Sequence, residues 1–239
     1  MPKLQIWLPY CGVAPAPGEW LTRWNLDPVL LLALGAAALL GRYASQPGRF
    51  WAAWGVTVIL FVSPLCALSS ALFSVRVAHH AILVAGVAPL LAGAFDLPRP
   101  RGGVSAWSAA HVVILWMWHS PPLYAWALAS DAAFWLMQLS LLGSGFGFWL
   151  AIRRAPELVA VGALLIGMMQ MGLLGALITF AGAPIYMPHL LTTASWGFSP
   201  LEDQQLAGLI MWAPAAVAYL GSAMFLLGRA LARAERAPA

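Results

Sequence analysis

The stretch Trp116-Met117-Trp118-His119-Ser120-Pro121-Pro122-Leu123-Tyr124 places an imidazole where a long apolar run meets two prolines. Because proline has no backbone N–H, we expect the helix that carries this run to end or kink at Pro121. Tryptophan and tyrosine are enriched where hydrocarbon gives way to lipid headgroups. The stretch therefore predicts a membrane helix with His119 near one surface, where an ionisable ring is a functional candidate. The alternative is a solvated interfacial side chain.

Composition predicts the class of protein. Hydrophobic residues make up 62% of the chain and charged residues 8%, whereas a soluble domain carries about 25% charged residues. The formal net charge is only +4 and no basic run with interleaved aromatic residues occurs, which argues against a nucleic-acid partner. The two cysteines, Cys11 in a polar tail and Cys66 in an apolar run, do not predict a disulfide framework. We expect an integral membrane protein.

Seven apolar segments predict an all-α bundle of seven transmembrane helices, each near the ~20 residues that a bilayer requires. The first begins at Asp27-Pro28, where a capping Asp precedes a first-turn proline, and ends near Gly41. The other six segments span about residues 50–72, 78–95, 104–120, 132–152, 157–181 and 205–228.

Basic residues predict the orientation, because cytoplasmic loops retain lysine and arginine. One side of the predicted bundle holds Arg42, Arg49, Arg99, Arg101, Arg153, Arg154, Arg229, Arg233 and Arg236. The other side holds only Lys3, Arg23 and Arg76. We therefore expect the N-terminus outside and the C-terminus in the cytoplasm. The predicted parts are an external tail at 1–24, the seven-helix domain at 25–230 and a cytoplasmic tail at 231–239.

This orientation gathers four of the five histidines on the outer side. His79 and His80 begin the third predicted helix, His119 ends the fourth and His189 lies in an outer loop. Consecutive helical residues point about 100° apart, so we expect one of His79 and His80 to face the bundle and the other to face headgroups. His111 lies deeper, where we expect packing or a hydrogen bond between helices.

Imidazole, thiolate and thioether groups suit copper, with Cu(I) favoured, and a set poor in oxygen argues against calcium and magnesium. The candidate metal ligands are His80, His119, His79, His189 and Cys11. The candidate supporting residues are Asp203, Gln204, Tyr186 and Met187. Asp203 begins the last predicted helix, so its alternative role is to cap that helix. Four mid-membrane methionines are expected to pack in the core, namely Met168, Met169, Met171 and Met211.

Three motifs then carry a family resemblance. They are Trp118 to Tyr124, His79-His80 followed by a helix ending in Pro89-Leu90-Leu91, and Asp203-Gln204-Gln205-Leu206-Ala207-Gly208-Leu209-Ile210-Met211-Trp212. In this order they resemble the CtaG family of polytopic assembly factors for caa-type cytochrome c oxidase, over most of the chain from about Trp24 to Trp212. The chain departs from the family pattern at two positions, because many members carry histidine where this chain has Arg76 and another near Gln138.

The resemblance implies a non-enzymatic protein of the bacterial inner membrane that helps to make active haem–copper oxidase, by delivering copper or by stabilising the oxidase during cofactor insertion. Its partners would be the oxidase subunits, a periplasmic copper donor and the lipid bilayer. The family's site positions carry over to His80, His119 and Asp203. Two alternatives stay open: a haem-binding redox protein with two axial histidines, and a copper permease lined by the methionines.

Overall fold

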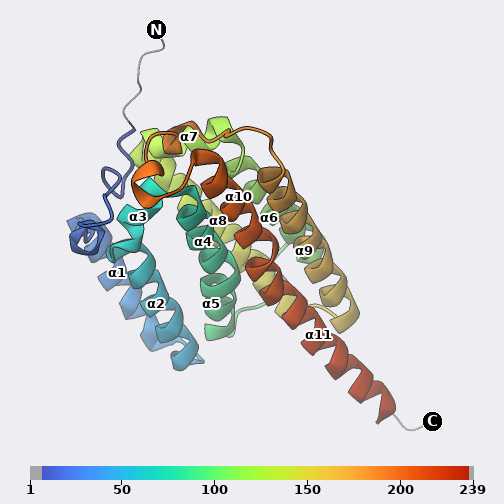
Figure 1. Cartoon of the computed structure of the whole chain (residues 1–239). Helices are drawn as coiled ribbons and strands as arrows, with labels where there is room; N and C mark the ends of the chain where they lie inside the picture. Colours follow the sequence, from blue (N-terminus) through green and yellow to red (C-terminus); the bar gives the residue numbers. More distant parts are fainter. Residues whose placement is uncertain (1–6, 237–239) are drawn as a thin grey trace.

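The computed structural model describes residues 7–236 and consists of helices joined mostly by short connections (Figure 1). Lys3, which entered the orientation argument, and the end of the predicted cytoplasmic tail, 237–239, lie outside the described residues. The helices are α1 (Pro28–Leu39), α2 (Pro47–Val62), α3 (Leu65–Ala71), α4 (Phe73–Ile82), α5 (Ala88–Ala94), α6 (Gly103–Trp118), α7 (Pro121–Ala129), α8 (Asp131–Arg153), α9 (Glu157–Thr179), α10 (Pro200–Trp212) and α11 (Pro214–Glu235).

Four helical segments are long and apolar enough to cross a membrane, as expected of a multi-pass membrane protein. They are Phe73–Ala94, Asp131–Arg153, Glu157–Thr179 and Pro200–Glu235. Helices α2 and α3 provide a fifth if the 50° bend between them lies within one span. Two shorter apolar helices, Pro28–Tyr43 and Gly103–Trp118, occupy the positions of the remaining predicted segments. The all-α class is confirmed, whereas the count of seven spans stays a prediction.

The double proline divides the chain where the sequence predicts. Helix α6 ends at Trp118 with His119 at its C-cap, and α7 begins at Pro121. Two prolines in the first turn are tolerated because the N–H groups there have no partner within the helix. Helix α7 lies at the same end of the bundle as α3 and the connection from α9 to α10 (Figure 1). We call this end the histidine end and the opposite one the arginine end.

Pro89 changes the helix that carries His79 and His80. Its ring crowds the carbonyl one turn earlier and it donates no hydrogen bond. The chain accommodates this with a π-helical turn at Leu83–Val87, which joins α4 to α5 in one span. The Trp149 indole donates to the Val84 carbonyl at 2.8 Å and so satisfies one of the displaced backbone acceptors. Such π turns are frequent at functional sites.

Asp203 of α10 caps the first turn of α4. Its carboxylate accepts hydrogen bonds from the backbone N–H groups of Phe73 at 2.7 Å and Ser74 at 3.2 Å. Its predicted alternative role as a cap of its own helix is wrong, because Ser199 and Glu202 form the capping box of α10. The residue that caps α4 therefore lies 130 positions away in the sequence.

Helices α9 and α10 cross closely at two glycines. A Cβ atom added to Gly175 would lie 2.7 Å from the Gly208 carbonyl oxygen, so no larger residue fits without a shift. Glycine at 175 therefore lets the two helices approach closely. The crossing holds α10, and with it Asp203, against the rest of the bundle.

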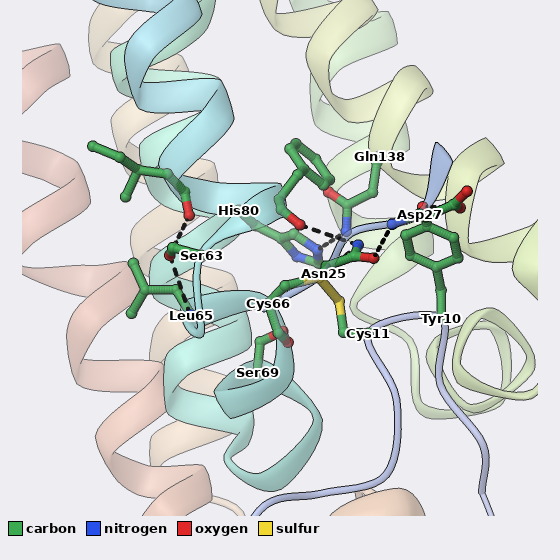
Figure 2. Close-up of a disulfide and its surroundings, with 12 residues drawn as sticks. Tyr10, Cys11, Asn25, Asp27, Ser63, Leu65, Cys66, Ser69, His80 and Gln138 are labelled. Atoms are coloured by element: carbon green, nitrogen blue, oxygen red, sulfur yellow. Dashed lines mark hydrogen bonds between the residues drawn. A yellow bond between two sulfur atoms is a disulfide. The ribbon is translucent and has the colours of Figure 1, made fainter. Parts of the chain in front are cut away.

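The N-terminal tail is fastened to the bundle by a disulfide between Cys11 and Cys66 (Figure 2). The expectation of no disulfide is wrong, because the tail folds back until the two α-carbons are 5.2 Å apart. Beside the disulfide, the Tyr10 hydroxyl donates to the Asp27 carboxylate at 2.5 Å. Partial burial and this bond raise the pKa of Tyr10 to about 12, so the phenol keeps its proton.

Candidate functional site: a buried histidine cluster

Buried polar side chains gather inside the histidine end of the bundle. Helix α4 contributes Arg76, His79 and His80, the end of α6 contributes His119, and α8 contributes Gln138. Each of these five side chains is at most 3% exposed. We refer to these five residues as the histidine cluster. Its burial excludes the reading of His119 as a solvated interfacial side chain.

His79 and His80 both face the interior. The prediction that one of them reaches the headgroups is wrong, because Phe61 of α2 covers His79 with its ring edge-on at a centroid distance of 4.8 Å. The centroids of the His79 and His80 rings are 6.0 Å apart. Neither ring nitrogen of His79 has a hydrogen-bond partner among the described residues.

His119 is held in one tautomer by the end of its own helix. Its Nδ1 lies 2.7 Å from the Leu115 carbonyl oxygen, which can only accept, so Nδ1 carries the proton of the neutral ring. The lone pair is then on Nε2, which is buried and has no partner in the described chain. The Tyr186 hydroxyl donates to the His119 carbonyl at 2.7 Å and fixes the backbone at the same point.

His80 lies beside His119, with ring centroids 5.4 Å apart and planes at 89°. Its Nε2 is 3.3 Å from the side-chain nitrogen of Gln138 (Figure 2). An amide nitrogen can only donate, so His80 Nε2 accepts and is the lone-pair nitrogen of a neutral ring. The cluster thus places two neutral imidazoles side by side, one with a free lone pair and one whose lone pair is held by Gln138.

Arg76 brings a positive charge into this cluster. It was expected in an outer loop, which is wrong because α4 begins at Phe73 and includes Arg76. The guanidinium lies over the Phe134 ring at 5.2 Å, and none of its three nitrogens has a hydrogen-bond partner in the described chain. Arg76 precedes His80 by four positions, so both lie on one face of α4.

His189 is buried near the cluster but both of its nitrogens are engaged. Nε2 lies 2.6 Å from the Tyr124 hydroxyl and Nδ1 lies 3.3 Å from the Ala71 carbonyl oxygen. The pKa of His189 is lowered to about 3, chiefly by burial; the Ala71 carbonyl opposes this shift and the charge of Arg76 adds to it. The neutral ring therefore fastens the outer connection to α3 and α7 and presents no free lone pair.

The remaining candidates lie outside the cluster. Cys11 is oxidised in the disulfide and offers no thiolate. Gln204 holds the outer connection, accepting from the Ile185 N–H at 2.8 Å and donating to the Ile178 carbonyl at 3.2 Å. Met187 is 61% exposed. Across residues 7–236 no three His, Cys, Asp or Glu side chains form a ready metal site. The candidate ligands that remain together are the neighbouring His80 and His119.

His111, Met171 and Met211 follow the packing expectation, which is wrong for Met169. His111 contacts the Ser144 hydroxyl at 3.2 Å and the Tyr219 hydroxyl at 3.0 Å, which confirms the predicted hydrogen bond between helices. Met171 and Met211 are buried, whereas Met169 is 66% exposed on the surface of the bundle. The four methionines therefore do not share one interior path.

Comparison with known proteins adds one finding. A family profile described as "Cytochrome c oxidase caa3 assembly factor (Caa3_CtaG)" matches residues 105–233, just over half of the 239 residues. The matched region includes His119, Gln138 and Asp203, while α4 with His79 and His80 precedes it. No curated protein and no solved structure matches the chain.

Proposed function

This chain belongs to the cytochrome c oxidase caa3 assembly factors, and from that premise we propose that it carries copper on His119 and His80 for the maturation of a haem–copper oxidase. Copper is here a cargo, received from a periplasmic donor and passed toward the oxidase. Family membership supports the assembly role and the interaction with the oxidase. The copper itself is the further step proposed here.

One observation carries the copper proposal. The Nε2 lone pair of His119 is buried and has no partner in the part of the chain that the structure describes, while its Nδ1–H is fixed by the Leu115 carbonyl. A metal-binding histidine typically donates its other N–H to a carbonyl or carboxylate, which sets the tautomer and orients the ring. Neutral imidazole is a ligand type that suits copper. His80 is the adjacent imidazole that would complete a two-histidine site once Gln138 releases its Nε2.

The same residues favour release over storage. Gln138 competes for the His80 lone pair, and Arg76 sets a positive charge on the same face of α4. Like charges repel more strongly away from bulk water. Both features would weaken the hold on a copper ion. A weak, reversible site suits a protein that hands its metal to another.

The test replaces each histidine by glutamine, which keeps a polar side chain of similar reach. His119→Gln and His80→Gln should each lower the copper content of the purified protein and the oxidase activity of membranes. Both measurements are normalised to the amount of this protein. His111→Gln is the matched control, because it removes an imidazole from outside the cluster and should leave copper content near normal.

Full oxidase activity and unchanged copper in both cluster variants, with the protein present, would contradict the proposal. An optical spectrum of the same preparations tests the haem alternative. A Soret band that is lost in His119→Gln would mean that the site binds haem and not copper.

A further inference from the structure

The second half of helix α11 contributes no buried residue to the bundle. The buried residues of the helix are Ala215, Tyr219 and Ala223, all in its first half. Only 22% of the most apolar window of the α10–α11 span is buried, against 61% for α8. Figure 1 shows α11 running away from α5 toward the arginine end. Helix α11 stays against α9, where Arg229 and Arg233 pair with Glu157, and the space between α11 and the helices α5 and α8 is left open.

A groove of about 720 Å³ lies in this space, lined by residues of α5, α8, α9 and α11. One part of its wall is apolar and includes Trp149, Phe225 and Leu226. The other part, toward the arginine end, is charged and includes Arg153, Arg229, Arg233 and Glu157. The groove therefore has an apolar wall and a basic opening at the arginine end, which we call the mouth.

The charges at the mouth are unbalanced. Glu157 is 2.9 Å from an Arg233 nitrogen and 3.7 Å from an Arg229 nitrogen, so one carboxylate faces two arginines. Arg153 has no carboxylate within 4.0 Å in the described chain. A Cβ atom on Gly93 would lie 2.9 Å from Arg49 and 3.2 Å from Arg153, which shows that two guanidinium groups converge there. The mouth thus carries an excess of fixed positive charge.

We propose that the groove is a binding site for an anionic phospholipid. The headgroup phosphate would lie among Arg153, Arg229 and Arg233, and an acyl chain would run along Phe225 and Leu226. Charge complementarity selects the headgroup, because basic pockets between membrane helices bind anionic lipid headgroups. The apolar wall selects a lipid over a free phosphate ion. Phe225 is 65% exposed, so the wall is open from the side of the bundle.

The charge test titrates the detergent-purified full chain with phosphatidylglycerol, in parallel with phosphatidylcholine, and measures bound lipid by native mass spectrometry. Phosphatidylglycerol should bind more tightly. Arg153→Gln should weaken it about fivefold, the effect expected for one basic residue near an anionic headgroup. Arg42→Gln is the control: it removes the same charge from an arginine that stacks on Tyr43, outside the groove.

The shape test fills the groove without changing its charge. Gly221 lines the groove and has open space around its Cβ position, so Gly221→Leu should fold and displace the lipid. Gly228→Leu adds the same side chain elsewhere on α11, also into open space, and should leave binding unchanged. Equal binding of the two lipids, equal losses in Arg153→Gln and Arg42→Gln, or full binding in Gly221→Leu would each overturn the proposal.

Discussion

Arg76 is a buried cation, and within residues 7–236 none of its guanidinium nitrogens has a hydrogen-bond partner. It stands one helical turn from His80 on the same face of α4. The cluster therefore combines neutral imidazoles with a fixed positive charge. That charge, more than the imidazoles, should set how tightly the cluster holds a cation.

Arg76→Gln should therefore bind copper more tightly than the natural protein, by roughly tenfold. Two unit charges within about 10 Å interact by ~1.7 kcal/mol at an effective dielectric constant of 20. Competition with a coloured Cu(I) chelator measures the affinity. An unchanged affinity would mean that copper does not bind near Arg76.

For single residues, the sequence identified which side chains were functional candidates better than it predicted what surrounds them. The Trp-His-Ser-Pro-Pro pattern indicated His119 as a helix-ending candidate, since its information is local. It gave no sign that His79 and His80 are both buried, because that depends on Phe61 of another helix and on an early start of α4. The engagement of His189 by Tyr124 was equally hidden, since the two residues are 65 positions apart.

Helix α4 depends on Asp203 for its first turn. Asp203→Ala leaves the Phe73 and Ser74 N–H groups unpaired, and should destabilise the protein by about 2–3 kcal/mol. Asp203→Asn keeps one accepting oxygen and should be milder, by about 1 kcal/mol. Thermal unfolding in detergent measures both. Copper occupancy should fall in the same order, because α4 carries His80.

The control for this prediction is Glu202→Ala, which removes the acidic residue of the α10 capping box at an exposed position. Its effect should be smaller than that of Asp203→Ala. If the two losses were equal, Asp203 would matter to its own helix and not to α4.

Element boundaries were predictable where their causes are local. The Asp27-Pro28 start and the break at Pro121 both follow from residues that act within one turn. The start of α4 was missed by about five residues, because its cap is supplied by α10. The disulfide was missed for a similar reason: sequence spacing does not show that a polar tail returns to the bundle.

For the whole molecule, topology is the first test. Reporter fusions after Arg154 and after Arg236 should behave as cytoplasmic, and one within Ala183 to Ser199 as external. The excess of arginine at one end favours this orientation. A disulfide near the other end favours it independently, because disulfides persist in oxidising compartments. An external C-terminus would overturn the proposed route for copper.

The disulfide itself gives a further prediction. Cys11→Ser and Cys66→Ser should each lower the thermal unfolding temperature, because the bond closes a loop of 55 residues and such a loop is worth about 4 kcal/mol in the chain-entropy account. The double variant should be no worse than either single variant, since all three lack the same bond. Reaction of the natural protein with a maleimide before reduction would show that the bond is absent.

The positions of those two cysteines also order events during synthesis. Cys11 precedes α1, and Cys66 comes just after α2, so both sulfurs are made before the helix that carries His79 and His80. If the N-terminus lies outside, as predicted, the bond forms only after the first hydrophobic segments have been inserted and both thiols have met an oxidant. The order of synthesis therefore allows the thiol-oxidising enzymes of the cell to close the bond before the helix that carries His79 and His80 is complete. A cell deficient in those enzymes should lose this protein, and oxidase activity with it, even when copper is plentiful.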